Sequence, residues 1–231
     1  MTGSENKSEV LPNLRIEGVC NASGGVYDSV NIDGVGKIIS GVEARTFQAN
    51  GQLKILGDLK SNEMLCDGIL GVRGNLQVSE GKINGMLTVD GTIGGEHLEV
   101  HGVWKAKKDC EIERIETEGA FFVDGLLNAG SLEVRLQGLS KANEIGVESI
   151  RVRRPPDNKW NLLRFIPKFQ PELQAKVIEG DDLDLENTTA EVVRGNRVLI
   201  GPGCNIGRVE YRSELIKHPR AKVGEEMKLG G

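Results

Sequence analysis

The chain has 231 residues and a formal net charge of −5, which argues against a general affinity for nucleic acid, because such binders carry a basic face. Only 4% of its residues are aromatic and 38% are hydrophobic, too few large side chains for a thick core. Glycine is abundant at 31 residues, so we expect a thin core with many tight corners.

The first residues suggest a tail rather than a targeting segment. Residues 1–13 contain no apolar stretch typical of a signal peptide, and no segment of the chain offers the roughly 20 apolar residues that span a bilayer. The four cysteines, at 20, 66, 110 and 204, form no CxxC pair. We therefore expect a disordered N-terminal tail over 1–13 and a cytoplasmic protein with reduced thiols.

From residue 14 onward the sequence is periodic. Six glycines are each 17 residues apart: Gly34, Gly51, Gly68, Gly85, Gly102 and Gly119. A second series, Gly57, Gly74, Gly91 and Gly125, keeps this period, with Lys108 as an exception and Gly41 one residue out of step. A fixed period of this length indicates a stacked repeat architecture.

Between the glycines, apolar residues recur in pairs two positions apart, as on one side of a β-strand. Three pairs fit in each coil, for example Val42/Ala44, Phe47/Ala49 and Leu53/Ile55. The positions predicted to face inward are apolar except for Gly36, Ser61, Gly81, Gly95 and Thr117, and none is charged. We predict an all-β fold: a right-handed parallel β-helix, a triangular β-solenoid with about 17 residues per coil.

The predicted β-helix covers residues 14–153 and resumes, less regularly, over 175–211. Residues 154–174 interrupt it as a basic and aromatic insert or linker, and 212–231 are expected to be a disordered C-terminal tail. The insert has two readings: contact with a membrane surface or partner, or packing on the side of the solenoid. The candidate contact residues are Trp160, Leu163, Arg164, Phe165, Lys168 and Phe169.

Neither end of the predicted solenoid has an obvious capping element, and an uncapped solenoid exposes strand edges that invite edge-to-edge addition. We therefore hypothesise that the ends are polymer interfaces. The candidate residues are Leu14, Ile16, Val30, Ile32, Val198, Ile200, Ile206, Val209 and Tyr211.

No catalytic, cofactor-binding or metal site is predicted. His97 and His101 flank the inward pair Leu98/Val100, and no cysteine or carboxylate cluster completes a metal shell around them. Cys66 and Cys110 fall in inward positions, as small buried hydrophobes do. The GPGCNIG segment at 201–207 lacks the Lys-Ser/Thr of a P-loop and is read as a solenoid corner.

The opening SGGVYDSVNIDGVGKI and the recurring units GMLTVDG, GILGVRG and GNLQV resemble the bactofilins, bacterial polymer-forming cytoskeletal proteins. The resemblance covers about residues 14–152 well and 175–211 more loosely. It implies a β-helix that assembles head to tail into non-polar, nucleotide-independent filaments. Such filaments are cytoplasmic scaffolds, often near the membrane, for cell shape or protein positioning. The implied partners are the chain itself, other bactofilins and scaffolded proteins, without a cofactor or nucleic acid.

Two alternatives remain open at this point. A monomeric or trimeric β-solenoid can act as an adaptor that displays partners along its side. A hexapeptide-type acyltransferase is also a β-solenoid, but that class has 18 residues per coil and a catalytic histidine at a trimer interface. The 17-residue period and the positions of the three histidines favour a non-enzymatic structural protein.

Overall fold

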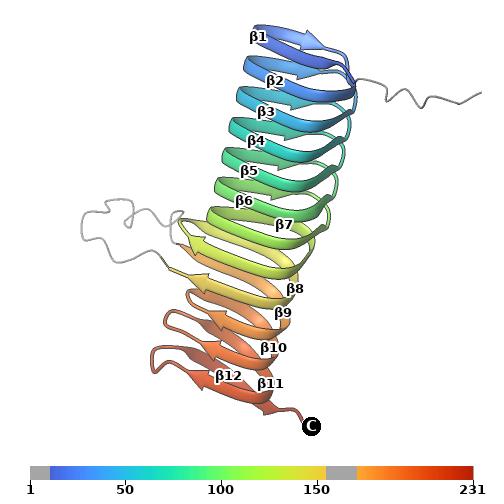
Figure 1. The fold of residues 1–231 in the computed structure, drawn as a ribbon. Coiled ribbons are helices and arrows are strands. Elements are labelled where there is room, and N and C mark those ends of the chain that lie inside the picture. The colour runs from blue at the N-terminus through green and yellow to red at the C-terminus, as the bar shows by residue number, and fades with distance from the viewer. Residues whose placement is uncertain (1–10, 155–170, 231) are drawn as a thin grey trace, which may run out of the picture.

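The computed structural model describes residues 11–154 and 171–230, which form a rod of stacked coils (Figure 1). Within these residues, twelve strands form one sheet in which each strand pairs in parallel with its sequence neighbours. The strands are β1 (Asn13–Ala22), β2 (Gly25–Ile38), β3 (Val42–Ile55), β4 (Leu59–Val72), β5 (Leu76–Val89), β6 (Ile93–Ala106), β7 (Cys110–Leu136), β8 (Leu139–Arg153), β9 (Glu172–Leu185), β10 (Thr188–Ile200), β11 (Asn205–Lys217) and β12 (Lys222–Lys228). The predicted parallel β-solenoid is confirmed.

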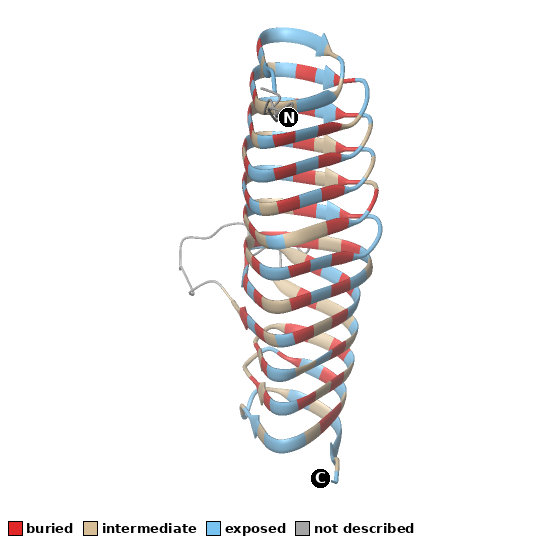
Figure 2. Ribbon diagram, turned by 45° about the vertical axis from the view of Figure 1, so that its right-hand side comes forward, coloured by how far each residue is buried: buried red, intermediate tan, exposed pale blue. Residues whose placement is uncertain are grey.

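Each regular coil consists of one 14-residue strand and a three-residue corner, not three separate short strands. Each strand bends twice, and its pairing with the next coil continues on both sides of each bend. In β3 one bend is at Arg45, which has no paired residue in β4, and the other is at Gly51. The three apolar pairs of β3, from Val42 to Ile55, are all buried, and the same pattern repeats from coil to coil. Figure 2 shows buried positions alternating with exposed ones along the strands in the middle of the rod.

The 17-residue glycine series forms a ladder at one bend. The six glycines have φ angles between +114° and +149°, a region that side-chain-bearing residues rarely adopt. A Cβ atom on Gly68 would lie 2.0 Å from the carbonyl oxygen of Gly51 in the preceding coil. Glycine is therefore required here by backbone conformation and by the close approach of neighbouring coils.

A second ladder, at the corner before each strand, was not anticipated from the sequence. The Oδ1 atoms of Asp58, Asn75 and Asp109 each accept a hydrogen bond from a backbone N–H one coil further on, at 2.7, 3.0 and 2.8 Å. These bonds satisfy donors at corners where strand pairing lapses. Their sequence signal is a recurring Asp or Asn at the last corner position, directly before the next strand, at the same 17-residue period.

The polar residues among the inward positions have partners. Thr117 Oγ1 accepts a 3.0 Å hydrogen bond from the indole Nε1–H of Trp104, and both side chains are buried. Trp104 also stacks on Phe121, with ring centroids 5.3 Å apart. Ser61 Oγ donates to the carbonyl oxygen of Glu63 at 2.7 Å. These two hydroxyls therefore fit the apolar core, because their hydrogen-bonding groups are satisfied.

The later coils continue along the same axis. Leu139 pairs with Glu172, a separation of 33 residues, which is one 17-residue coil plus residues 155–170. The predicted contact residues from Trp160 to Phe169 all lie in this range, outside the described residues. β9 then continues the stack directly on β8.

The prediction of a disordered tail from residue 212 is wrong for the described residues. β11 extends to Lys217, and β12 adds a further strand over Lys222–Lys228. The high charge of this segment suggested disorder. The charged side chains are accommodated because most of them lie on the outside or at the end of the rod.

Candidate assembly interfaces at the ends of the solenoid

The N-terminal end presents an apolar layer and an open strand edge. β1 pairs with β2 on one side only, so its other edge has no strand partner within the described chain. The register places Leu14, Ile16, Cys20 and Ala22 above the inward positions of β2. Leu14 is half-buried and Ile16 is 6% exposed. This layer bears no charge, as the sequence-based hypothesis for this end requires.

Val30 and Ile32, also predicted interface residues, belong to the second coil. They are 1% and 2% exposed because β1 covers them. Their role at this end is to support Leu14 and Ile16 from below rather than to face a neighbouring subunit.

The C-terminal end is formed by different residues from those predicted. Val198, Ile200, Ile206 and Val209 are at most 2% exposed and are covered by following coils. Tyr211 is half-buried and pairs with Lys228 of β12. The predicted residues are core residues, because two strand segments that the sequence reading assigned to the tail lie over them.

The end itself consists of the second half of β11 together with β12. Its inward positions hold Leu215, Lys217, Val223, Glu226 and Lys228, in register with Val198, Ile200, Ile206, Val209 and Tyr211. Lys217 and Glu226 form an ion pair there. The core of the solenoid therefore terminates in a mixed, largely charged layer at this end and in an apolar layer at the other.

The sides of the rod carry cross-coil ion pairs at the 17-residue period. Lys60 Nζ lies 2.7 Å from Glu43, and Lys82 Nζ lies 2.9 Å from Glu99. Asp90 lies between Arg73 and Lys107, at 2.6 and 2.8 Å, and hydrogen bonds from Lys107 and Arg73 lower the pKa of its carboxyl group. Individually such exposed pairs contribute little, but each disfavours a shifted register between coils.

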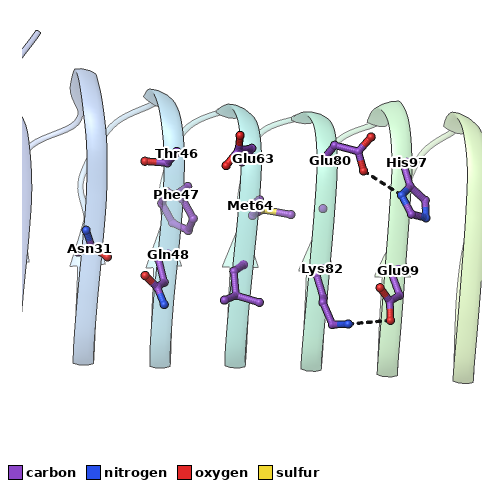
Figure 3. A pocket seen from close by; sticks show the side chains of 12 residues that line it. Asn31, Thr46, Phe47, Gln48, Glu63, Met64, Glu80, Lys82, His97 and Glu99 are labelled. Carbon is purple, nitrogen blue, oxygen red and sulfur yellow. Dashed lines mark hydrogen bonds and ion pairs between the residues drawn. The ribbon is translucent and has the colours of Figure 1, made fainter.

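A shallow groove of about 450 Å³ on one side of β2–β6 contains His97, one of the two histidines at which the sequence predicted no metal site (Figure 3). His97 Nδ1 lies 2.9 Å from Glu80, and its Nε2 lies 3.5 Å from Glu116. Beside it, Lys82 and Glu99 form the ion pair described above. The geometry is that of a charged ladder.

Within the described residues, no group of three or more His, Cys, Asp or Glu side chains could hold a metal ion. The buried cysteines are poor nucleophiles, because burial raises the thiol pKa of Cys66 and Cys204 to about 11 and that of Cys110 to about 12. Cys20 is the exposed cysteine. The part of the chain that the structure describes has no helix that could cross a bilayer.

The stacked coils and the two unlike ends define an elongated parallel β-solenoid. The chain is 40% identical over 239 aligned residues to the uncharacterized protein YhbE of Bacillus subtilis (strain 168), covering 96% of this chain and 100% of YhbE. It therefore belongs to the YhbE family. It is also 42% identical over 106 residues to the uncharacterized protein YhbF of the same organism, covering 46% of this chain and 42% of YhbF. No family model matches the chain, and no solved structure matches it.

Proposed function

We propose that this protein is a bactofilin-like structural subunit that stacks end to end into nucleotide-independent filaments, which act as a scaffold for cell shape or protein positioning. The observation that carries the proposal is the N-terminal end, where, among the described residues, nothing covers the apolar core or the outer strand edge of β1. The proposal includes a cytoplasmic location, with other proteins bound along the sides of the filament.

The physical argument begins with the unpaired edge. A strand edge offers a row of backbone N–H and C=O groups that another strand can pair with, and single solenoids usually cover it with a polar cap. Here Leu14, Cys20 and Ala22 continue the core columns up to the last layer. Stacking a second apolar end on this layer removes these side chains from water. This burial stabilises the contact by about 25 cal/mol per Å² of buried apolar surface.

The two ends favour contacts between like ends. An apolar N-terminal layer gains most from a second apolar layer, whereas placing it on a C-terminal end would desolvate the Lys217–Glu226 ion pair and Lys228. Two C-terminal ends can instead exchange ion pairs between lysine and glutamate side chains. We therefore propose filaments with two alternating contacts between like ends, in place of the head-to-tail stacking that the resemblance implies. The C-terminal contact should weaken as salt increases.

Negative-stain electron microscopy of the chain without nucleotide tests the proposal directly. The parent should form filaments one solenoid wide. The double substitution Leu14→Glu with Ala22→Glu changes two half-buried positions of β1 and should leave only short particles. Arg15→Glu is the matched control: it also changes the net charge by −2, but on the outer side of the same strand, where Arg15 is exposed.

Arg15→Glu should leave filament length unchanged, with circular dichroism confirming that all three proteins retain their β-structure. Single rods from the parent at every protein and salt concentration would overturn the proposal. So would filaments of normal length from the double variant. Discrete trimers would instead favour the acyltransferase-type alternative.

A further inference from the structure

One corner of the rod carries an exposed apolar stripe that neither end contact uses. It lies directly after the glycine ladder, where the register aligns Val19, Val35, Gln52, Ile69, Met86 and Val103 in consecutive coils. Val19 is 87% exposed, Val35 48%, Ile69 46% and Met86 39%. With strands about 4.8 Å apart, the five spacings between them extend over about 24 Å.

The stripe is exposed for a structural reason. The positive φ angle of each glycine turns the chain at the bend, so the next residue points outward at the edge of the rod. Isolated exposed hydrophobic residues are common, but a continuous row in register indicates a contact surface. Gln52 is the one polar residue in the row.

Charged columns of opposite sign flank the stripe. The residues two positions before those of the stripe form one outward-facing column, which includes Asp33 and Asp67. The residues two positions after those of the stripe form a second outward-facing column, which includes Lys37, Lys54 and Lys105. Elsewhere on the rod, several charges pair between coils. In the described chain, Asp33, Lys37 and Lys54 form no ion pair, so these charges are available to a partner molecule.

We propose that this corner binds the same corner of a second copy of the chain, side by side and parallel, around a two-fold axis along the rod. Such an axis places each stripe residue opposite its own copy and exchanges the two flanks. Asp33 of one copy then faces Lys37 of the other, and Asn50 faces Lys54.

An antiparallel arrangement in the register centred on Ile69 brings like charges together. It places Asp67 opposite Asp67 of the second copy and Lys37 opposite Lys105. Like charges in contact are unfavourable, so the charge pattern favours the parallel arrangement, which pairs Asp33 with Lys37, over this antiparallel register. This inference goes beyond the end-to-end stacking proposed above and does not depend on it, because the corner is the same in a single rod and in a filament.

Cysteine cross-linking tests the arrangement. All variants carry Cys20→Ser, to remove the exposed thiol, and Leu14→Glu with Ala22→Glu, to block the N-terminal end contact. Under mild oxidation, Val35→Cys alone and Val103→Cys alone should each give covalent dimers. The control Gln48→Cys is exposed on another face of the rod. Each stripe variant should give about tenfold more dimer than the control, which corresponds to about 1.4 kcal/mol.

The other outcomes are decisive. Dimers that form only when Val35→Cys and Val103→Cys are mixed would overturn the parallel arrangement. Dimer yields equal to that of Gln48→Cys would overturn lateral pairing altogether. Because the N-terminal end contact is blocked in every variant, including the control, that result would leave the proposed end-to-end stacking untouched.

A second pair of variants changes the strength of the contact in opposite directions. In the Val35→Cys background, Ile69→Lys should reduce the dimer yield and Gln52→Leu should increase it, because the first interrupts the apolar row and the second completes it. Both positions are exposed, so neither change should affect folding. The same yield from both variants would contradict the stripe as the contact surface.

Discussion

Replacing Thr117 with valine should destabilise the solenoid although the shape of the side chain barely changes. The Thr117 hydroxyl is the acceptor for the buried indole N–H of Trp104, at 3.0 Å. Trp104 is 0% exposed and Thr117 is 3% exposed, so water cannot replace the lost acceptor. Valine fills the same space, and the expected effect is therefore the penalty of an unsatisfied buried donor, about 1–3 kcal/mol.

The assay is guanidinium and thermal unfolding followed by far-UV circular dichroism, in the Leu14→Glu with Ala22→Glu background, so that the proposed N-terminal contact does not contribute. A loss of 1 kcal/mol should lower the melting temperature by roughly 2–4 °C in a chain of this size. Thr88→Val, at a half-exposed position of β5, is the control and should stay within about 0.5 kcal/mol of the parent.

A double-mutant cycle isolates the hydrogen bond from the change in packing. Once Trp104→Phe has removed the donor, Thr117→Val should cost less than about 1 kcal/mol, since no indole N–H is left without an acceptor. An equal loss in the presence and absence of Trp104 would refute the reasoning, as would a Thr117→Val variant as stable as the parent.

Three further outcomes follow from the structure. Gly68→Ala should destabilise the rod by several times more than Gly71→Ala in thermal unfolding, because the new Cβ would lie 2.0 Å from a backbone oxygen at the first position and 3.9 Å from its nearest neighbour at the second. Equal effects would contradict the glycine ladder. A hydrogen bond from Arg194 lowers the pKa of Glu210 below its ordinary 4.5 in the folded chain, so its ionised form adds stability that is lost as the pH falls through that lowered pKa. The Glu210→Gln variant should thus melt below the parent at pH 7, and the gap should narrow below pH 4.5; a constant gap would rule out this ion pair as the cause. Cys20 should react with iodoacetamide in the native chain while the three buried cysteines react only after denaturation, as mass spectrometry can measure; early labelling of all four would contradict their burial.

The fold was predictable because each coil repeats the same local constraints. Glycine at a fixed period marks the positive-φ bend, and alternating apolar pairs mark the inward side of each strand. Both signals are local in the chain, and the 17-residue period brings equivalent residues into register. Residues 175–211 were recognised for the same reason, although their coils are less regular.

The C-terminal end was not predictable in this way. Inward side chains of the last coil have a neighbouring coil on one side only and reach solvent on the other. Lys217 and Glu226 can therefore occupy inward positions there, although a middle coil would exclude charge from them. By composition alone, such a strand looks like a solvated tail. The assignment of Val198, Ile200, Ile206 and Val209 to the C-terminal end failed with it, because the end of the solenoid lies two strand segments further along the chain.

The sequence by itself determined the repeat, the inward positions and the location of the corners, because these depend on residues within one coil. Only the tertiary structure decided which columns face one another across coils: the Asp and Asn ladder, the ion pairs along the sides, and the apolar stripe between columns of opposite charge. Such columns arise from residues 17 positions apart that come within a few ångströms after stacking. Whether a side chain in such a column forms a hydrogen bond or an ion pair depends on which residue lies opposite it in the next coil, and only the stacking of the coils determines that.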